Sequence, residues 1–152
     1  MAYWLMKSEP AEVSIDDLAT RGSVPWFGVR NYQARNFMRN AMRIGDCAFF
    51  YHSGCARPGI AGICEIATPA HVDDTQFDPE SSCFDPKSSP DAPRWWCVDV
   101  KFVRKTCLVG LPELRAQPAL AGMQLLRRGN RLSITPVSEA EWQFITRNLM
   151  RG

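Results

Sequence analysis

The sequence lacks the features that would place a protein in a membrane or let it coat nucleic acid by charge alone. Its 18 basic and 16 acidic residues leave a net charge of only +2, too small for non-specific coating. No apolar run approaches the roughly 18 to 20 residues needed to span a bilayer, and the first residues lack a basic segment followed by an apolar core. We therefore expect a cytoplasmic protein with no membrane partner, and any contact with nucleic acid must be local.

Groups that usually carry catalysis or hold metal ions are also scarce. The chain has two histidines, and its six cysteines contain no CxxC pair, which argues against a structural zinc site. It has no Gly-rich phosphate loop, no paired acidic motif and no dinucleotide fingerprint. His52 stands beside Ser53 and three residues before Cys55, but neighbours in sequence do not define a nucleophile and its base. We expect no metal, no cofactor and no catalytic residue, with His52 hydrogen-bonded at a strand end and the cysteines as free thiols.

With 152 residues and 45% hydrophobic content, the chain has the size of one domain spanning residues 1–152. Apolar runs predict strands over residues 2–6, 47–53, 59–67, 95–103 and 131–137. The run over 95–103 alternates, with Trp96, Val98, Val100 and Phe102 on one face. A long loop over residues 72–94, pinned by Phe77 and Phe84, separates these runs. This irregular mixture of strands and short helices is typical of an α+β domain whose sheet curls towards a barrel.

Capping signals predict where the short helices begin. Ser14 with Asp17 and Ser138 with Glu141 have the spacing of capping boxes, which predicts helices over 15–20 and after Ser138. Pro112 suits the first turn of a helix over 111–117.

The stretch over residues 24–38 mixes residue types that a simple core segment would not. Val24-Pro25 is conformationally restrained and presents Trp26 from a stiff turn. Gly28 permits close approach to the backbone, and Asn31 is placed to cap a helix that begins near Tyr32. Each feature alone also fits an ordinary core tryptophan or helix cap, but their convergence favours a binding site.

The predicted helix after Asn31 has two distinct faces. Arg35, Arg39 and Arg43 recur every four residues and predict a basic stripe that would contact a phosphate backbone. Its apolar face consists of Ala34, Phe37, Met38, Ala41 and Met42.

A planar polar ligand needs aromatic faces to stack on and fixed polar groups to read its edge. The faces are available from Trp26, Tyr32 and Trp95. Polar groups finish two buried strands and begin the helix, and they are Lys7, Ser8, Asn31, His52 and Ser53. The residues therefore favour binding over catalysis.

Several separated segments resemble the EVE domain family, and the resemblance covers nearly the whole chain. The longest matching blocks are WLMKSEP over 4–10, GVRNYQARN over 28–36 and FFYHS over 49–53. Shorter matches are DPKS over 85–88, PRW over 93–95 and RLS over 131–133. The resemblance implies a PUA-like fold, a small curved β-barrel of about five to six strands with short helices, related to YTH and ASCH domains.

The resemblance also implies a pocket that accepts a modified base, a modified cytosine in DNA or a base in RNA. The residues carried over to that pocket are Lys7, Ser8, Trp26, Val29, Asn31, Tyr32, His52, Ser53, Lys87 and Trp95. Phe27 departs from the family pattern, which has a polar residue there, and it makes the rim of the predicted pocket more apolar.

Three functions remain open from the sequence. The first is a reader that takes a flipped or unpaired modified base into an aromatic pocket. The second is an enzyme, or an accessory domain of one, that modifies RNA or nucleotides; the missing acid–base pair speaks against it. The third is an interaction domain without a small pocket.

Overall fold

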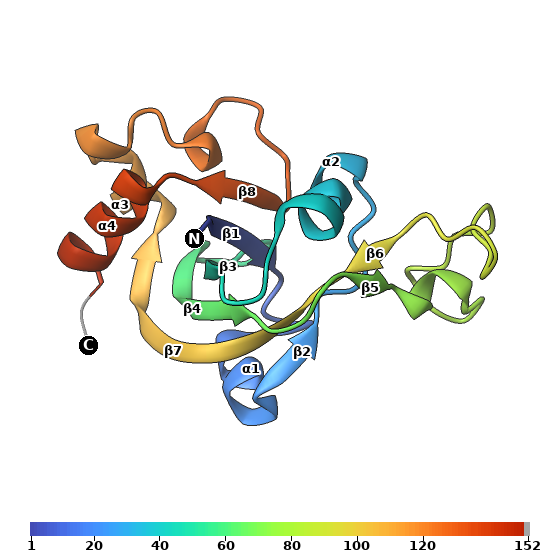
Figure 1. Ribbon diagram of the computed structural model, residues 1–152. Coiled ribbons are helices and arrows are strands. Elements are labelled where there is room, and N and C mark those ends of the chain that lie inside the picture. The colour runs from blue at the N-terminus through green and yellow to red at the C-terminus, as the bar shows by residue number, and fades with distance from the viewer. Residues whose placement is uncertain (151–152) are drawn as a thin grey trace.

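The structure, a computed structural model, describes residues 1–150, which fold into an α+β arrangement around one mixed sheet (Figure 1). Within these residues the sheet has six strands in the order β2-β7-β4-β3-β1-β8. Their bounds are β1 Tyr3–Ser8, β2 Ser23–Pro25, β3 Cys47–His52, β4 Gly59–Ile66, β7 Asp99–Gly110 and β8 Ile134–Val137. A second, two-stranded sheet pairs β5, His71–Val72, with β6, Trp96–Cys97. β1 and β3 run parallel, and the other paired strands are antiparallel.

The predicted closure into a barrel is wrong, because the sheet stays open. Its two edge strands, β2 and β8, are short and do not pair with each other. β7 is 12 residues long and curves along the sheet (Figure 1), and its register with β4 shifts twice. Such irregularities bend a strand and increase its local twist, so the sheet curves without closing.

The helices begin where the caps predict. The structure has both predicted capping boxes, at α1 (Ile15–Arg21) and at α4 (Glu139–Asn148). Asn31 caps α2 (Tyr32–Asn36) by accepting a hydrogen bond from Ala34 N at 3.0 Å. Pro112 lies in the first turn of α3 (Leu111–Arg115). Short 3₁₀ turns occupy Asp74–Phe77, Pro118–Leu120 and Gln124–Leu126.

The predicted basic stripe after Asn31 is broken. α2 ends at Asn36 and continues as a π-helix over Phe37–Ala41, in which the hydrogen bonds join residues five apart. The π-helix ends at Ala41 and Met42 is already extended, so Arg43 lies beyond the helix and the three arginines do not share one helical face. On the apolar side Ala34 and Met38 are fully buried, whereas Ala41 is exposed.

The segment over 72–103 also differs from its prediction. Gln76 and Asp73 anchor the long loop as buried polar residues, whereas Phe84 is 39% exposed. Gln76 Nε2 donates to the carbonyls of Asp73 and Trp95, at 2.7 and 2.8 Å. The predicted strand over 95–103 divides into β6 and β7. Trp95 and Cys97, which the alternation places opposite Val98 and Val100, are buried as well. This part of the chain is buried on both faces, so it lacks the exposed face that a half-buried strand would have.

Two hydrophobic clusters cover the two faces of the sheet. One contains Trp4, Met6 and Phe50 together with residues of α1, α2 and the π-helix. The other contains Leu5, Phe49 and Tyr51 together with residues of α3 and α4. Alternate residues of β1 and β3 thus belong to opposite clusters, as expected for buried strands. A pocket opens beside the first cluster, and Val24, Trp26 and Val29 belong to both.

Candidate functional site

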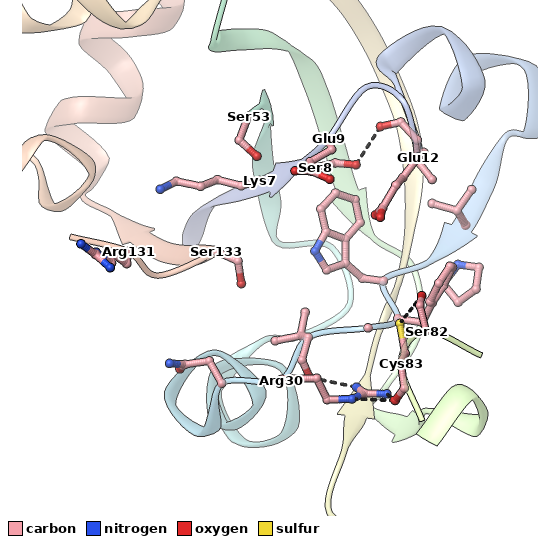
Figure 2. A pocket seen from close by; sticks show the side chains of 18 of the residues that line it. Lys7, Ser8, Glu9, Glu12, Arg30, Ser53, Ser82, Cys83, Arg131 and Ser133 are labelled. Atoms are coloured by element: carbon pink, nitrogen blue, oxygen red, sulfur yellow. Dashed lines mark hydrogen bonds between the residues drawn. The ribbon is translucent and has the colours of Figure 1, made fainter. Parts of the chain in front are cut away.

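A pocket of about 830 Å³ lies at the carboxyl ends of β1 and β3, within the size range of small-molecule sites. Figure 2 shows side chains from several separate segments around it. These are Lys7 and Ser8 at the end of β1; Glu9, Glu12 and Val13 after it; Arg21; residues 24–31; Ser53; Ser82 and Cys83; and Arg131 and Ser133. The pocket therefore depends on the tertiary fold and not on one local motif.

The polar floor of the pocket follows from the parallel pairing of β1 with β3. Parallel strands end at the same edge of a sheet, so Ser8 and Ser53 meet there, and Ser53 N donates to Ser8 O at 3.0 Å. Lys7 N donates to Ser133 O at 2.8 Å and so brings the segment before β8 into the site. The Ser8 hydroxyl donates to Val13 O at 2.7 Å, whereas the hydroxyls of Ser53 and Ser133 make no hydrogen bond within residues 1–150.

Charged side chains of both signs surround the opening. Figure 2 shows Lys7, Arg131 and Ser133 on one side, and Glu12, Ser82 and Cys83 on the other. Lys7 is half-buried; burial lowers the pKa of its ammonium group, which lies 5.9 Å from the centroid of the Tyr51 ring. Within the described residues the side chains of Glu9, Glu12, Arg21 and Arg131 form no ion pair. These groups can bind a polar ligand without first breaking an internal salt bridge.

Trp26 and Val29 form the apolar wall, and both belong largely to the core. Trp26 is only 6% exposed, its ring lies edge-on to Phe50 at 5.5 Å, and its backbone N donates to Val98 O at 2.8 Å. Gly28 has a φ of +83°, and a Cβ atom there would lie 3.0 Å from Cys83 Sγ. A residue other than glycine would be strained here, so the wall passes close against residue 83.

Asp73 and Arg30 fix this wall from behind. Asp73 Oδ2 accepts hydrogen bonds from Gly28 N at 2.8 Å and from Arg30 Nη1 at 3.1 Å. Arg30 also donates to Cys83 O, through Nε at 3.1 Å and Nη2 at 2.6 Å. Burial alone would raise the pKa of Asp73, but hydrogen bonds from Thr75, Gly28 and Arg30 outweigh it and hold the pKa below its usual value. Asp73 is therefore an ionised clamp between the wall and the long loop.

Tyr32 and Trp95 stack on each other outside the pocket lining. Their ring centroids are 4.9 Å apart with an interplanar angle of 21°. Arg35 covers the Tyr32 ring at 4.7 Å, and Arg30 lies 5.3 Å from the Trp95 ring. Trp95 Nε1 donates to Asp85 Oδ2 at 2.7 Å. This stack attaches the long loop to α2, and Lys87, also outside the lining, is exposed on that loop.

His52 also lies outside the pocket lining, and the prediction that it is hydrogen-bonded at a strand end is confirmed. Its Nε2 accepts a hydrogen bond from Ile15 N at 3.1 Å, at the start of α1. Burial lowers the pKa of His52 below 6.5, which favours the neutral ring that this bond requires. His52 thus holds α1 against the sheet.

The three arginines predicted to contact a phosphate backbone do not line the pocket. Arg35 is half-buried and donates to Arg94 O at 2.8 Å and to Asn36 Oδ1. Arg39 and Arg43 are exposed. Arg35 is therefore engaged in holding the loop, whereas the other two are open to solvent.

Six of the ten predicted pocket residues line the cavity, namely Lys7, Ser8, Trp26, Val29, Asn31 and Ser53. The Asn31 side chain is already engaged as the cap of α2. Sequence reasoning missed Glu9, Glu12, Arg21, Arg30, Arg131 and Ser133 among the lining residues. The matching family blocks contain four of these residues, namely Glu9, Arg30, Arg131 and Ser133, so the resemblance could have assigned them to the pocket. No local feature of the sequence indicated Arg21.

One other cluster of reactive residues lies beside the small sheet. His71 Nε2 lies 2.8 Å from Asp99 Oδ1, and Cys97 Sγ lies 3.7 Å from His71 Nδ1. Burial raises the pKa of the Cys97 thiol to about 12, so the thiolate needed for nucleophilic attack is disfavoured. Within residues 1–150 no group of three or more His, Cys, Asp and Glu side chains is arranged to hold a metal ion. No helix in the same range is long and apolar enough to cross a membrane.

Comparison with known proteins gives one consistent family. The EVE domain model matches residues 2–148. Thymocyte nuclear protein 1 from Homo sapiens is 44% identical over 164 residues, which cover 95% of this chain and 72% of the relative. A crystal structure of a Pseudomonas putida protein superposes with a TM-score of 0.93 at 49% identity and covers 96% of this chain and 98% of that one.

Two further structures bear on the site and on the fold. A crystal structure of human THYN1 protein in complex with 5-methylcytosine-containing DNA superposes with a TM-score of 0.90 at 42% identity, covering 95% of each chain. An ASCH protein from Zymomonas mobilis superposes with a TM-score of 0.55 at 8% identity, covering 98% of this chain and 99% of that one. At that identity the likeness concerns the fold alone.

Proposed function

The chain belongs to the EVE domain family, and from this premise we propose that it reads 5-methylcytosine in DNA, taking the base into the pocket between β1, β3 and residues 24–31. The base reaches the pocket from a single strand or by flipping out of a duplex, because its edge is inaccessible inside the stack. The protein acts as a binding module and carries out no chemistry on the base.

The observation that carries this proposal is the composition of the pocket. An apolar wall, with Val24, Trp26 and Val29, faces a set of donors and acceptors that are not engaged in ion pairs within the described residues. A relative of the same fold is known in complex with 5-methylcytosine-containing DNA. The two facts together favour a base as ligand over an arbitrary small molecule.

Each part of a methylated cytosine has a suitable counterpart in this pocket. The exocyclic N4 amine is a donor, and carboxylates accept from it, which suits Glu9 or Glu12. The ring acceptors suit the Lys7 ammonium group and the Ser53 hydroxyl. The 5-methyl group is apolar and suits contact with Val29 or the exposed part of Trp26. The methyl group therefore adds apolar contact to a set of polar contacts that both forms of cytosine share.

Phosphate contacts come from cations at the opening. Arg131 and Arg21 line the pocket and form no ion pair within residues 1–150, so they can neutralise backbone charge on either side of the bound base. Phosphate contacts position a protein on nucleic acid, and base contacts supply specificity. Arg39 and Arg43 remain candidates for a more distant contact.

The alternative of an RNA- or nucleotide-modifying enzyme has less support. His52 already accepts a hydrogen bond from Ile15 N, and the thiol of Cys97 has a raised pKa. Neither residue is poised as a general base. The cytoplasmic location expected from the sequence stays a prediction.

The test is a titration of matched oligonucleotides that carry 5-methylcytosine or cytosine at one position, single-stranded and in duplex. We expect tighter binding of the methylated form, and weaker binding of that form by Ser53→Ala and Lys7→Met, with the melting temperature of each variant measured in parallel. Ser138→Ala is unsuitable as the serine control because Ser138 caps α4. Ser89→Ala is the better one, because Ser89 is exposed in the long loop and its hydroxyl, among the described residues, accepts only a long hydrogen bond from Ala92 N, at 3.3 Å. Absence of binding to every oligonucleotide would exclude the proposed function.

A further inference from the structure

Phe27 is a large apolar side chain that is exposed to solvent at the opening of the pocket. It is 48% exposed and lines the opening next to the buried Trp26. Exposing half of a phenylalanine side chain to water is unfavourable. Isolated exposed apolar residues are nevertheless common, so exposure alone does not indicate a function. What distinguishes Phe27 is its position, because it stands between the solvent and the cavity that receives the base.

The backbone on both sides of Phe27 is fixed. Trp26 N donates to Val98 O at 2.8 Å, and Gly28 N donates to Asp73 Oδ2 at 2.8 Å. The ring therefore cannot withdraw into the core by a simple movement of the loop. Preorganisation of this kind lowers the entropy lost when a side chain binds a partner.

Resting on the proposed function, we propose that Phe27 is a wedge that enters the space left in a duplex when the methylated cytosine swings into the pocket. Flipping a base leaves its former neighbours unstacked, and proteins that distort duplexes insert apolar side chains such as Phe between base steps. An aromatic ring can stack on any base, so Phe27 would support flipping without reading sequence. Arg21 and Arg131, which line the same opening, would contact the flanking phosphates.

This inference separates duplex binding from single-strand binding. A single strand has no partner-strand stack to repair, so the wedge matters little there, whereas the base pocket matters for both. Phe27→Ala should therefore lower affinity for the methylated duplex by roughly tenfold to a hundredfold, the range expected when one stacking interaction is removed. For the methylated single strand we expect affinity to fall by less than about threefold.

The experiment measures affinities of the wild type, Phe27→Ala, Phe27→Trp and Phe84→Ala for one methylated sequence in both forms. Phe84 is the matched control, because it is also an exposed phenylalanine, at 39%, but does not line the pocket. Phe27→Trp should keep the wild-type ratio of duplex to single-strand affinity, and Phe84→Ala should keep both affinities. Melting temperatures should agree within about 2 °C, since the changes are at the surface.

Three outcomes overturn the wedge. Equal losses of affinity on duplex and single strand would make Phe27 part of the pocket wall, no loss on either would remove it from the interface, and an equal effect of Phe84→Ala would indicate general apolar contact. If the wild type binds neither the methylated duplex nor the methylated single strand, the proposed function itself fails. If the wild type binds but Phe27→Ala leaves the ratio of duplex to single-strand affinity unchanged, only the wedge fails.

Discussion

At the level of residues, the pocket depends on Asp73, a side chain that does not line it. Asp73 is 2% exposed and accepts hydrogen bonds from Gly28 N, Arg30 and Thr75. Its carboxylate thereby joins residues more than 40 positions apart in the sequence. Sequence reasoning leaves Asp73 as one of several polar loop residues, because nothing local distinguishes an acid that is exposed from one that is clamped.

Replacing this acid should affect stability and binding together. Asp73→Asn keeps the shape of the side chain but replaces a carboxylate oxygen with an NH₂ group. The N–H donors of Gly28, Arg30 and Thr75 then share one acceptor oxygen instead of two. We expect the free energy of unfolding to fall by about 1 to 3 kcal/mol, measured by urea denaturation, and weaker binding of methylated DNA. The control is Asp78→Asn, whose exposed carboxylate accepts only from Glu80 N at 2.9 Å among the described residues; a similar fall in both variants would refute the role of Asp73.

His52 gives a prediction about pH. Burial lowers the pKa of His52 in the folded protein below 6.5, its ordinary value, which also applies to the unfolded chain. At a pH between the folded and the unfolded pKa, the unfolded chain therefore binds a proton that the folded chain does not. Its contribution to stability is therefore complete above the unfolded pKa and is lost as the pH falls through the folded pKa.

His52→Gln keeps an acceptor for Ile15 N but cannot titrate. We expect the stability of the wild type to fall more steeply than that of His52→Gln between pH 7.5 and pH 5, as measured by urea denaturation at each pH. Parallel curves for the two proteins would show that His52 does not titrate across this window.

At the level of elements, the sequence predicts what depends on neighbours along the chain. The capping boxes at Ser14 and Ser138 and the cap at Asn31 are confirmed, because a cap is a contact over two or three residues. The predicted basic stripe of three arginines does not form, because the helix ends at Ala41, before Arg43, and no capping signal in the sequence marks that end. Arg35 is drawn to Arg94 O by the folded loop, a contact across 59 residues that periodicity does not encode.

The segment before β8 supplies the cation we expect to contact phosphate. Arg131→Ala should reduce the slope of log affinity against log salt by about 0.7 on a single strand or 0.9 on duplex, the change expected when one phosphate is no longer neutralised. Binding of methylated and unmethylated strands should weaken alike, because phosphate contacts carry no base information.

Arg39→Ala is the comparison, since Arg39 is exposed on the π-helix and does not line the pocket. We expect its salt dependence to change less than that of Arg131→Ala, because the contact proposed for Arg39 lies farther from the bound base. A flatter slope for Arg39→Ala with no change for Arg131→Ala would move the backbone contact from the pocket to the π-helix.

At the level of the whole molecule, the sheet explains both the success and the failure of sequence reasoning. The predicted strands over 47–53 and 59–67 are confirmed as β3 and β4, which pair with each other in the sheet. The parallel pairing of β1 with β3, which brings Lys7 and Ser8 next to Ser53, joins strands more than 40 residues apart. Hydrophobic patterning reveals which residues are buried but not which strand lies beside which. Arg21 therefore could not be assigned to the site, and Arg131 could be assigned only through the family block that contains it.

Because segments from both halves of the chain build the pocket, a ligand that fills it should stabilise the whole fold. A ligand at a hundred times its Kd adds about 2.7 kcal/mol to the free energy of unfolding, and each kcal/mol raises the melting temperature of a domain this size by about 2 to 4 °C. The methylated single strand should therefore raise the melting temperature by roughly 5 to 11 °C. An unmethylated strand that binds tenfold more weakly should give about half of that shift at the same concentration. Equal shifts for the two strands would mean that the pocket binds cytosine without sensing its methyl group, and Val29 and Trp26 would then not be the methyl-contacting wall.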